Sequence, residues 1–145
     1  MVREAIKEDL YELLSLYLFL HEKDVPEDTR HLEITWNKII EDVNHHIIVN
    51  EINGKILSSC VCVIIPNLTR NMRSYAFIEN VVTNEEYRGK GYATECLNYA
   101  KEIAINNNCY KMMLLTGTKN ESTLDFYKNA GYNSEDKTAF IQWLE

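Results

Sequence analysis

Hydrophobic positions recur along this chain with two different periods, and their alternation predicts a mixed α/β protein. Apolar residues at every third or fourth position predict helices over residues 9–20, 29–41 and 93–104. Runs rich in β-branched and aromatic residues predict strands at residues 2–5, 46–50, 55–65, 75–83 and 111–116. The expected fold class is therefore α/β.

Turn and cap residues complete this prediction. Asn53-Gly54 separates two strand-like runs and predicts a hairpin turn. Ser122, with Asp125 three positions later, predicts the cap of a short helix that ends before Gly131. A final strand pair is expected from about residue 132 to 144. No repeat, linker or low-complexity segment interrupts the chain, so we expect one domain over residues 1–145.

Composition and charge restrict the kinds of function to consider. The net charge of −7 argues against nucleic-acid binding, which requires a basic face to neutralise phosphates. No apolar stretch approaches the ~18 residues of a membrane span, and the first residues have no signal-peptide pattern. The four cysteines lack metal-ligand or disulfide spacing, so we expect reduced structural thiols and no metal. We therefore expect a cytoplasmic protein without membrane or nucleic-acid partners.

One segment carries clear candidate chemistry, the run Tyr87-Arg88-Gly89-Lys90-Gly91-Tyr92-Ala93 between a predicted strand and a predicted helix. Glycines let the backbone approach an anion closely, and the first N–H groups of a helix face it with the positive end of the dipole. The segment therefore predicts a phosphate-binding turn. It differs from a Walker loop, because Gly91 is followed by Tyr92, and from a dinucleotide fingerprint, because Thr94 replaces the third glycine. A glycine-assisted connection without any ligand is the structural alternative.

A second segment, Asn120-x-x-Thr123-x-x-x-Tyr127-x-x-x-Gly131-Tyr132, follows about thirty residues after Arg88-x-x-Gly91-x-Ala93. Together the two segments resemble the signature of the GNAT superfamily of acetyl-CoA-dependent N-acetyltransferases, and the resemblance covers about residues 75–135. The predicted order of elements, with two helices between the first two strands, matches the same family. The resemblance implies a single GNAT domain with an acyl-CoA N-acyltransferase fold, in which helices flank a mixed, mostly antiparallel central sheet. It also implies acetyl-CoA as the donor substrate.

The resemblance also implies where acetyl-CoA binds. Main-chain groups of Val81, Val82 and Thr83 would pair with the pantetheine arm, and Asn120 would hydrogen-bond that arm. The pyrophosphate would lie against the backbone of the turn, formed by Arg88, Gly89, Lys90, Gly91, Tyr92 and Ala93. Local similarity to glucosamine-6-phosphate N-acetyltransferases is also visible around Ile78–Val82, although those relatives usually have Glu-Asp where this chain has Glu79-Asn80.

Two side chains are candidate catalytic residues. Tyr127 matches the family phenol near the thioester sulfur, and a phenol of pKa about 10 can protonate a leaving thiolate at neutral pH. Glu79 interrupts an otherwise apolar strand, on the face expected to carry Phe77 and Val81 as well. A carboxylate there could accept the proton of an attacking amine, since an alkyl amine of pKa about 10.4 is neutral in only about 1 molecule in 2,500 at pH 7. The alternatives are a tyrosine that packs beside Phe126 and a glutamate that faces solvent.

The expected function is direct transfer of an acetyl group from acetyl-CoA to a primary amine, without a covalent acyl-enzyme. Neither motif contains a cysteine, which disfavours a route through an enzyme thioester. The favoured acceptor is a small molecule, for example a polyamine or an amino sugar. The alternatives are a protein lysine or N-terminal acetyltransferase and a non-catalytic CoA-binding sensor. A homodimer is compatible with the chain, but no motif indicates one.

His45 and His46 are adjacent, so on a strand they would point to opposite faces.

Overall fold

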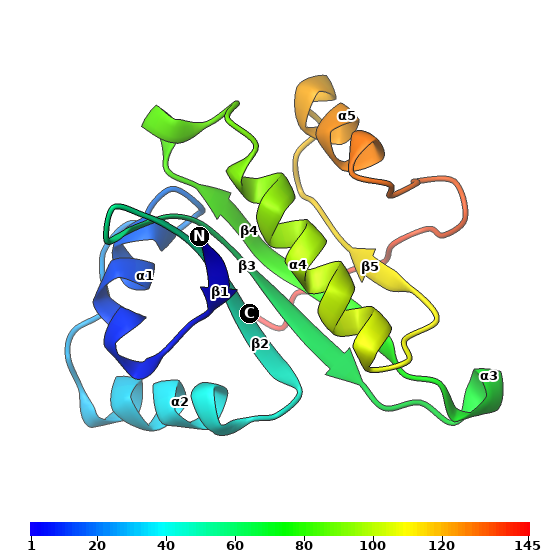
Figure 1. Cartoon of the computed structure of the whole chain (residues 1–145), viewed down its shortest axis with the longest axis horizontal. Coiled ribbons are helices and arrows are strands. Elements are labelled where there is room, and N and C mark those ends of the chain that lie inside the picture. The colour runs from blue at the N-terminus through cyan, green and yellow to red at the C-terminus, as the bar shows by residue number, and fades with distance from the viewer.

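The computed structural model describes all 145 residues and contains a five-stranded sheet (Figure 1). The strands lie in chain order across the sheet: β1 (Val2–Glu4), β2 (His45–Ile52), β3 (Lys55–Ile65), β4 (Tyr75–Thr83) and β5 (Met112–Leu114). All neighbours are antiparallel except β4 and β5, which are parallel. The prediction of a mixed, mostly antiparallel sheet is therefore confirmed.

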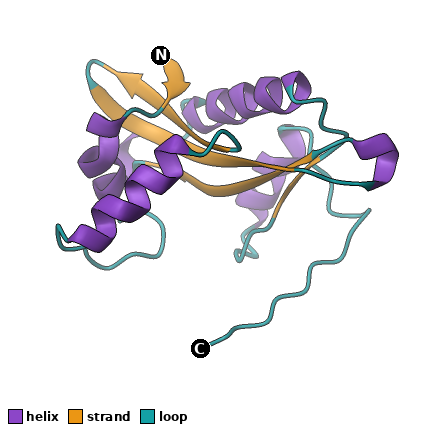
Figure 2. Ribbon diagram, turned by 90° about the horizontal axis from the view of Figure 1, so that it is seen from below, coloured by secondary structure: helices purple, strands orange, loops and turns teal.

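Helices cover both faces of the sheet (Figures 1 and 2). Their bounds are α1 (Leu10–Tyr17), α2 (Arg30–Glu41), α3 (Thr69–Met72), α4 (Tyr92–Asn106) and α5 (Glu121–Asn129), with 3-10 turns at Lys7–Asp9 and Glu85–Tyr87. Helices α1 and α2 lie on one face, and α4 crosses the other. None of these helices is both long and apolar enough to cross a membrane.

The sheet is buried on both sides, which explains the continuous apolar character of β3. On the α4 face Cys60, Cys62 and Ile64 join a core cluster with residues of α4. On the α1/α2 face Val61 packs against Leu13 and Trp36 within a second cluster. Because alternate side chains of a strand point to opposite faces, both sets must be apolar when both faces are covered.

The cysteines are free thiols, as the sequence predicted. Burial is the first cause of a raised pKa at Cys60, Cys62 and Cys96, and it raises the pKa of the last two to about 12. Thiols that stay protonated and buried act as small apolar side chains, because the thiolate is the nucleophilic form.

An ion-pair cluster joins the first strand to its neighbours. The Arg3 guanidinium lies 2.6 Å from an oxygen of Asp9 and 2.6 Å from an oxygen of Glu51. Asp9 also accepts a hydrogen bond from the backbone N–H of Ile6, at 2.8 Å. The hydrogen bond from Arg3 is the main reason why the pKa of Asp9 lies below its usual value.

Two local predictions were wrong. Helix α5 is capped by Asn120, whose side-chain oxygen accepts the N–H of Ser122, and not by Ser122 itself. The expected strand pair between residues 132 and 144 is absent, since no helix or strand follows α5. The residues there have strand-forming side chains, but a strand forms only where a partner edge satisfies its backbone.

Candidate functional site

Strands β4 and β5 pair over only three rungs and then part. The pairing runs from Ala76 opposite Met112 to Ile78 opposite Leu114, whereas β4 continues to Thr83. Beyond Ile78 the β5-facing edge of β4 therefore has no strand partner. This opening leads along Val81, Val82 and Thr83 towards the start of α4 (Figure 1). A ligand with amide groups could pair with such an edge as an added strand would.

A β-bulge marks the start of the opening. The register of β3 and β4 shifts between Ser59 and Val61, so that Asn80 and Val81 together oppose Cys60 alone. Asn80 adopts a left-handed conformation with φ of 50°, which asparagine tolerates better than most residues. An extra residue of this kind redirects the backbone groups and side chains that follow it.

The bulge changes which side chains share a face of the sheet with Glu79. Glu79 lies opposite Val61 of the α1/α2-face cluster, but Val81 packs against the α4-face cluster. Strict alternation would have put Glu79 and Val81 on the same face of the sheet. The residue inserted at the bulge reverses the face of each side chain that follows it in the strand. Glu79 is exposed and faces the α1/α2 side.

The turn before α4 has the form of an anion cradle. Gly91 is the N-cap residue of α4 with φ of 86°, and no side chain caps the helix. Gly89 is also left-handed, with φ of 75°. The first N–H groups of a helix need partners from outside the helix, and here no side chain accepts from them at the positive end of the dipole.

Two basic side chains flank this cradle. Arg88 donates from Nε to the carbonyl of Thr83 at 3.3 Å, which ties the turn to the end of β4. The Lys90 ammonium lies 4.9 Å from the ring centroid of Tyr87. Tyr92 and Ala93 form the first turn of α4. The six residues from Arg88 to Ala93 thus provide backbone donors and two cations at one place.

Tyr127 lies on α5 and packs against the α4-face cluster. Its ring centroid is 5.0 Å from that of Phe126 and 6.3 Å from that of Tyr132, the latter in an edge-on arrangement. The pKa of Tyr127 is raised, first by burial and then by the nearby Cys60 thiol. The phenol therefore stays protonated at neutral pH and can act as a hydrogen-bond or proton donor.

Asn120 is already partly engaged within the chain. Its side-chain oxygen accepts hydrogen bonds from the backbone N–H of Ser122 at 2.9 Å and from the Ser122 hydroxyl at 2.7 Å. The side-chain amide group remains to donate to a ligand.

A cavity of about 240 Å³ lies between α1, α2 and the sheet, and nine of the twelve residues that line it are hydrophobic. Its lining includes Tyr17, Trp36 and Val61, and it reaches the bulge residue Asn80. None of these residues was among the site residues predicted from the sequence. The only available signal was the asparagine inside an apolar strand, which predicts a departure from regular pairing.

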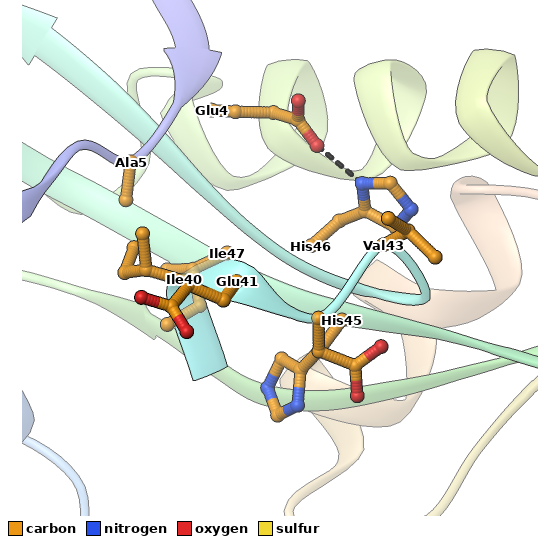
Figure 3. A pocket seen from close by; sticks show the side chains of 9 residues that line it. Glu4, Ala5, Ile40, Glu41, Val43, His45, His46 and Ile47 are labelled. Carbon is orange, nitrogen blue, oxygen red and sulfur yellow. Dashed lines mark hydrogen bonds and ion pairs between the residues drawn. The ribbon is translucent and has the colours of Figure 1, made fainter. Parts of the chain in front are cut away.

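The adjacent histidines line a second cavity of about 190 Å³ (Figure 3), and His45 lines the first cavity as well. His46 pairs with Glu4, whereas His45 points away from it, as predicted for neighbours on a strand. Burial is the first cause of a lowered pKa at His45. None of the candidate site residues lines this cavity, and no cluster of three potential metal-binding side chains occurs in the structure.

Known proteins resemble this chain in sequence and in fold. A model of the acetyltransferase (GNAT) family matches residues 7–132. A solved structure of a candidate acetyltransferase from Agrobacterium tumefaciens is 37% identical, covers 99% of both chains and superposes with a TM-score of 0.91.

Two curated relatives are longer than this chain. A glucosamine 6-phosphate N-acetyltransferase of Trypanosoma brucei is 32% identical over 84 residues, which are 58% of this chain and 55% of the relative. An uncharacterised N-acetyltransferase of Methanocaldococcus jannaschii is 26% identical over 99% of this chain and 64% of its own length. The chain thus spans between half and two thirds of these relatives.

Proposed function

Because the chain belongs to the acetyltransferase (GNAT) family, whose members use acetyl-CoA as donor, we propose that it transfers the acetyl group to a primary amine of a small molecule. The observation that supports this most directly is the opening between β4 and β5, which leads from the bulge at Asn80 to the uncapped start of α4. The opening has an unpaired backbone edge, and it leads to the turn before α4, which is the proposed phosphate cradle. Such a path suits a long, amide-containing thioester with a pyrophosphate at one end.

The chain supplies groups for each part of acetyl-CoA. The backbone from Arg88 to Ala93 would bind the pyrophosphate, and the free edge of Val81, Val82 and Thr83 would pair with the pantetheine amides. Asn120 would donate from its amide group, because its oxygen is held by Ser122. Backbone N–H groups near the bulge would stabilise the negative charge that develops on the carbonyl oxygen.

The two candidate catalytic residues belong to different sides of the sheet. Glu79 faces the α1/α2 side, and Tyr127 packs against the α4-face cluster. We assign the proton of the attacking amine to the Glu79 carboxylate, directly or through water, and the protonation of the leaving thiolate to the Tyr127 hydroxyl. The carbon–nitrogen bond forms first and gives a tetrahedral intermediate, and its collapse breaks the carbon–sulfur bond. Proton acceptance from the amine and proton donation to the thiolate are then separated in space.

The apolar cavity between α1, α2 and the sheet narrows the class of acceptor. It reaches Asn80, and Val61 in its lining is the cross-strand partner of Glu79. An amine with an apolar substituent could place that substituent in the cavity and its nitrogen beside Glu79. A phosphorylated amino sugar fits this lining poorly, because burial of an unpaired phosphate is costly, and Glu79-Asn80 also departs from the Glu-Asp of the sugar-phosphate enzymes.

The test is thiol release from acetyl-CoA over a panel of amines: alkyl amines, apolar amino acids, polyamines, glucosamine 6-phosphate and lysine peptides. We expect turnover with apolar amines. The Tyr127→Phe protein should show a kcat at least about tenfold lower, because general-acid catalysis typically contributes ~10²–10⁴-fold, and its acetyl-CoA affinity by calorimetry should be unchanged.

Tyr132→Phe is the matched control, because Tyr132 packs against Tyr127 in the same half-buried environment. Equal rates for Tyr127→Phe and wild type would remove Tyr127 from the mechanism. Acetyl-CoA binding without turnover of any amine would instead indicate a binding module, and turnover of lysine peptides alone would indicate a protein acceptor.

A further inference from the structure

Asn50 is a polar residue inside the apolar core of the sheet. It lies on β2, and its exposed fraction is 0%, as is that of the preceding apolar residues Ile48 and Val49. Burial of an amide group is costly unless its donors and its acceptor find hydrogen-bond partners. The partners of Asn50 therefore indicate what this side chain does in the structure.

The Asn50 amide binds the first turn of α4. Its nitrogen donates to Oε2 of Glu95 at 2.6 Å and to the carbonyl of Tyr92 at 3.4 Å. Its oxygen accepts from the nitrogen of Met1 at 3.3 Å. Each polar atom of the side chain thus has a partner, and both acceptors belong to the first turn of α4.

Apolar contacts alone would fix the start of α4 less closely. Figure 1 shows α4 crossing the sheet, and Ile48 packs with Cys96 and Leu97 in the α4-face cluster. Hydrophobic contacts are non-directional, so they oppose a small shift of the helix along its axis less than a hydrogen bond does. A hydrogen bond to a carboxylate is short and directional. The contact between Asn50 and Glu95 therefore fixes the position of this turn over the sheet.

The same turn carries the backbone donors of the proposed phosphate cradle. The first hydrogen bond of α4 is donated by the N–H of Glu95 to the carbonyl of Gly91 at 3.0 Å. The N–H groups of residues 92–94 precede this bond and need partners from outside the helix. A ligand that pairs with the edge of β4 and also binds these donors requires a fixed spacing between the strand and the turn.

We propose that Asn50 and Glu95 are positioning residues for acetyl-CoA. Their hydrogen bond holds the first turn of α4 where its N–H groups can bind the pyrophosphate while the pantetheine arm lies along β4. This role rests on the proposed function, since it requires acetyl-CoA at that turn. Neither side chain needs to touch acetyl-CoA, because a turn that is already in place lowers the ordering cost of binding.

Glu95 also has an electrostatic effect on the cradle, which opposes anion binding. Its carboxylate is exposed in the first turn of α4, where negative charge favours the helix dipole but repels a pyrophosphate. The hydrogen bond and the charge can be separated by substitution. Glu95→Gln and Glu95→Ala both remove the charge, but only glutamine keeps an oxygen that can accept from Asn50.

The first test compares the acetyl-CoA affinities of these two variants by calorimetry. Alanine is the better helix former, so weaker binding by Glu95→Ala would result from the lost acceptor. We expect its Kd to be about fivefold higher than that of Glu95→Gln, the size of one neutral hydrogen bond. The KM of the amine, and kcat at saturating acetyl-CoA, should be equal in both.

Hydrogen exchange without acetyl-CoA tests the position of the turn directly. Asn50→Val keeps an apolar, strand-forming side chain in the core but cannot donate. We expect faster exchange in peptides that cover residues 92–98, and wild-type exchange in peptides from β3. Ser59→Ala is the matched control, because Ser59 is also fully buried and its hydroxyl donates to the Ile48 carbonyl at 2.8 Å, within the sheet. It should leave both the exchange of residues 92–98 and the acetyl-CoA affinity unchanged.

Equal Kd values for the two Glu95 variants would overturn the proposal, and so would wild-type exchange of residues 92–98 in Asn50→Val. Faster exchange over the whole chain would indicate a general loss of stability and would also overturn it. Because Glu95 is exposed, its variants give a result even where Asn50→Val does not fold. A wild-type protein that does not bind acetyl-CoA would refute the proposed function itself, whereas wild-type binding with equal Kd values would refute the positioning role alone.

Discussion

The two halves of the sheet differ in the contacts that join the edge strand to its neighbour. Strand β1 shares three rungs with β2, and backbone hydrogen bonds from Ala5 to Ile47 and from Glu51 to Met1 extend this contact at both ends. The ion pairs of Arg3 also connect β1 to β2 and to the first 3-10 turn. Strands β4 and β5 share three rungs and then separate, so that β4 has no strand partner beyond Ile78 on its β5 side. We call β1 to β3 the closed half of the sheet, and β4 and β5 the open half.

We expect this difference to separate the residues that determine the free energy of unfolding from those that determine acetyl-CoA binding and turnover. Substitutions in the closed half, apart from those at Asn50, should change the free energy of unfolding with little effect on catalysis. Substitutions at the opening should change binding or turnover with little effect on unfolding. Three changes, in order of decreasing expected effect, test that separation.

Glu79→Gln should have the largest effect, because it removes the proposed proton acceptor from the open half. We expect kcat/KM for the amine to fall by about 100-fold at neutral pH, within the usual range of general-base catalysis. Glu102→Gln is the control, because Glu102 is an exposed glutamate on α4. Steady-state kinetics across pH measures the effect, and identical pH profiles for Glu79→Gln and wild type would contradict the assignment.

Asp9→Asn should destabilise the closed half. Arg3 holds the pKa of Asp9 below its usual value, so the ion pair stabilises the fold above the ordinary carboxyl pKa and its contribution disappears as pH falls through the lowered value. We expect a loss of about 1–3 kcal/mol at pH 7, and a smaller difference from wild type below about pH 4.

Urea unfolding at several pH values measures this loss. Glu8→Gln, at the exposed neighbouring position, should change little. A constant difference between Asp9→Asn and wild type at all pH values would contradict a role for the ion pair.

Gly54→Ala and Gly91→Ala form a matched pair with one member in each half. Both glycines have positive φ, 78° and 86°, and an added methyl group would meet no atom within 4 Å in either place. Each substitution should cost about 1–2 kcal/mol of stability from backbone strain. Only Gly91→Ala should also weaken acetyl-CoA binding severalfold in calorimetry, because Gly91 shapes the cradle. Equal acetyl-CoA affinities would contradict the position of that cradle.

Local patterns in the sequence predicted most of the fold because they depend on interactions between residues that are close in the chain. The Asn53-Gly54 turn, the apolar stripe of α4 and the glycines before it each follow from nearest-neighbour chemistry. The bulge at Asn80 was missed because it depends on the register between two strands. The face of Glu79 was therefore predicted correctly relative to Phe77 and wrongly relative to Val81.

The remaining errors concern the N-cap of α5 and strand pairing after Tyr132, which residues close in the sequence do not determine. Asn120 and Ser122 are both good N-cap residues, and only the path of the chain into α5 decides between them. The residues after Tyr132 have the composition of strands, but pairing requires a partner edge that the sequence does not identify. The roles of Tyr127, Glu79 and Asn120 remain proposals from the family resemblance and from the geometry around them.

The unbroken neighbour order of the sheet has a consequence for how the chain folds. Strands β2, β3 and β4 follow one another in both sequence and space, with a two-residue turn between the first two. β1, in contrast, must close a loop of some forty residues to meet β2. Because short loops close fastest, we expect the β2–β3 hairpin to form early and the first strand to dock late. Substitutions at the Asn53-Gly54 turn would then slow folding, whereas those at Arg3 would mainly speed unfolding.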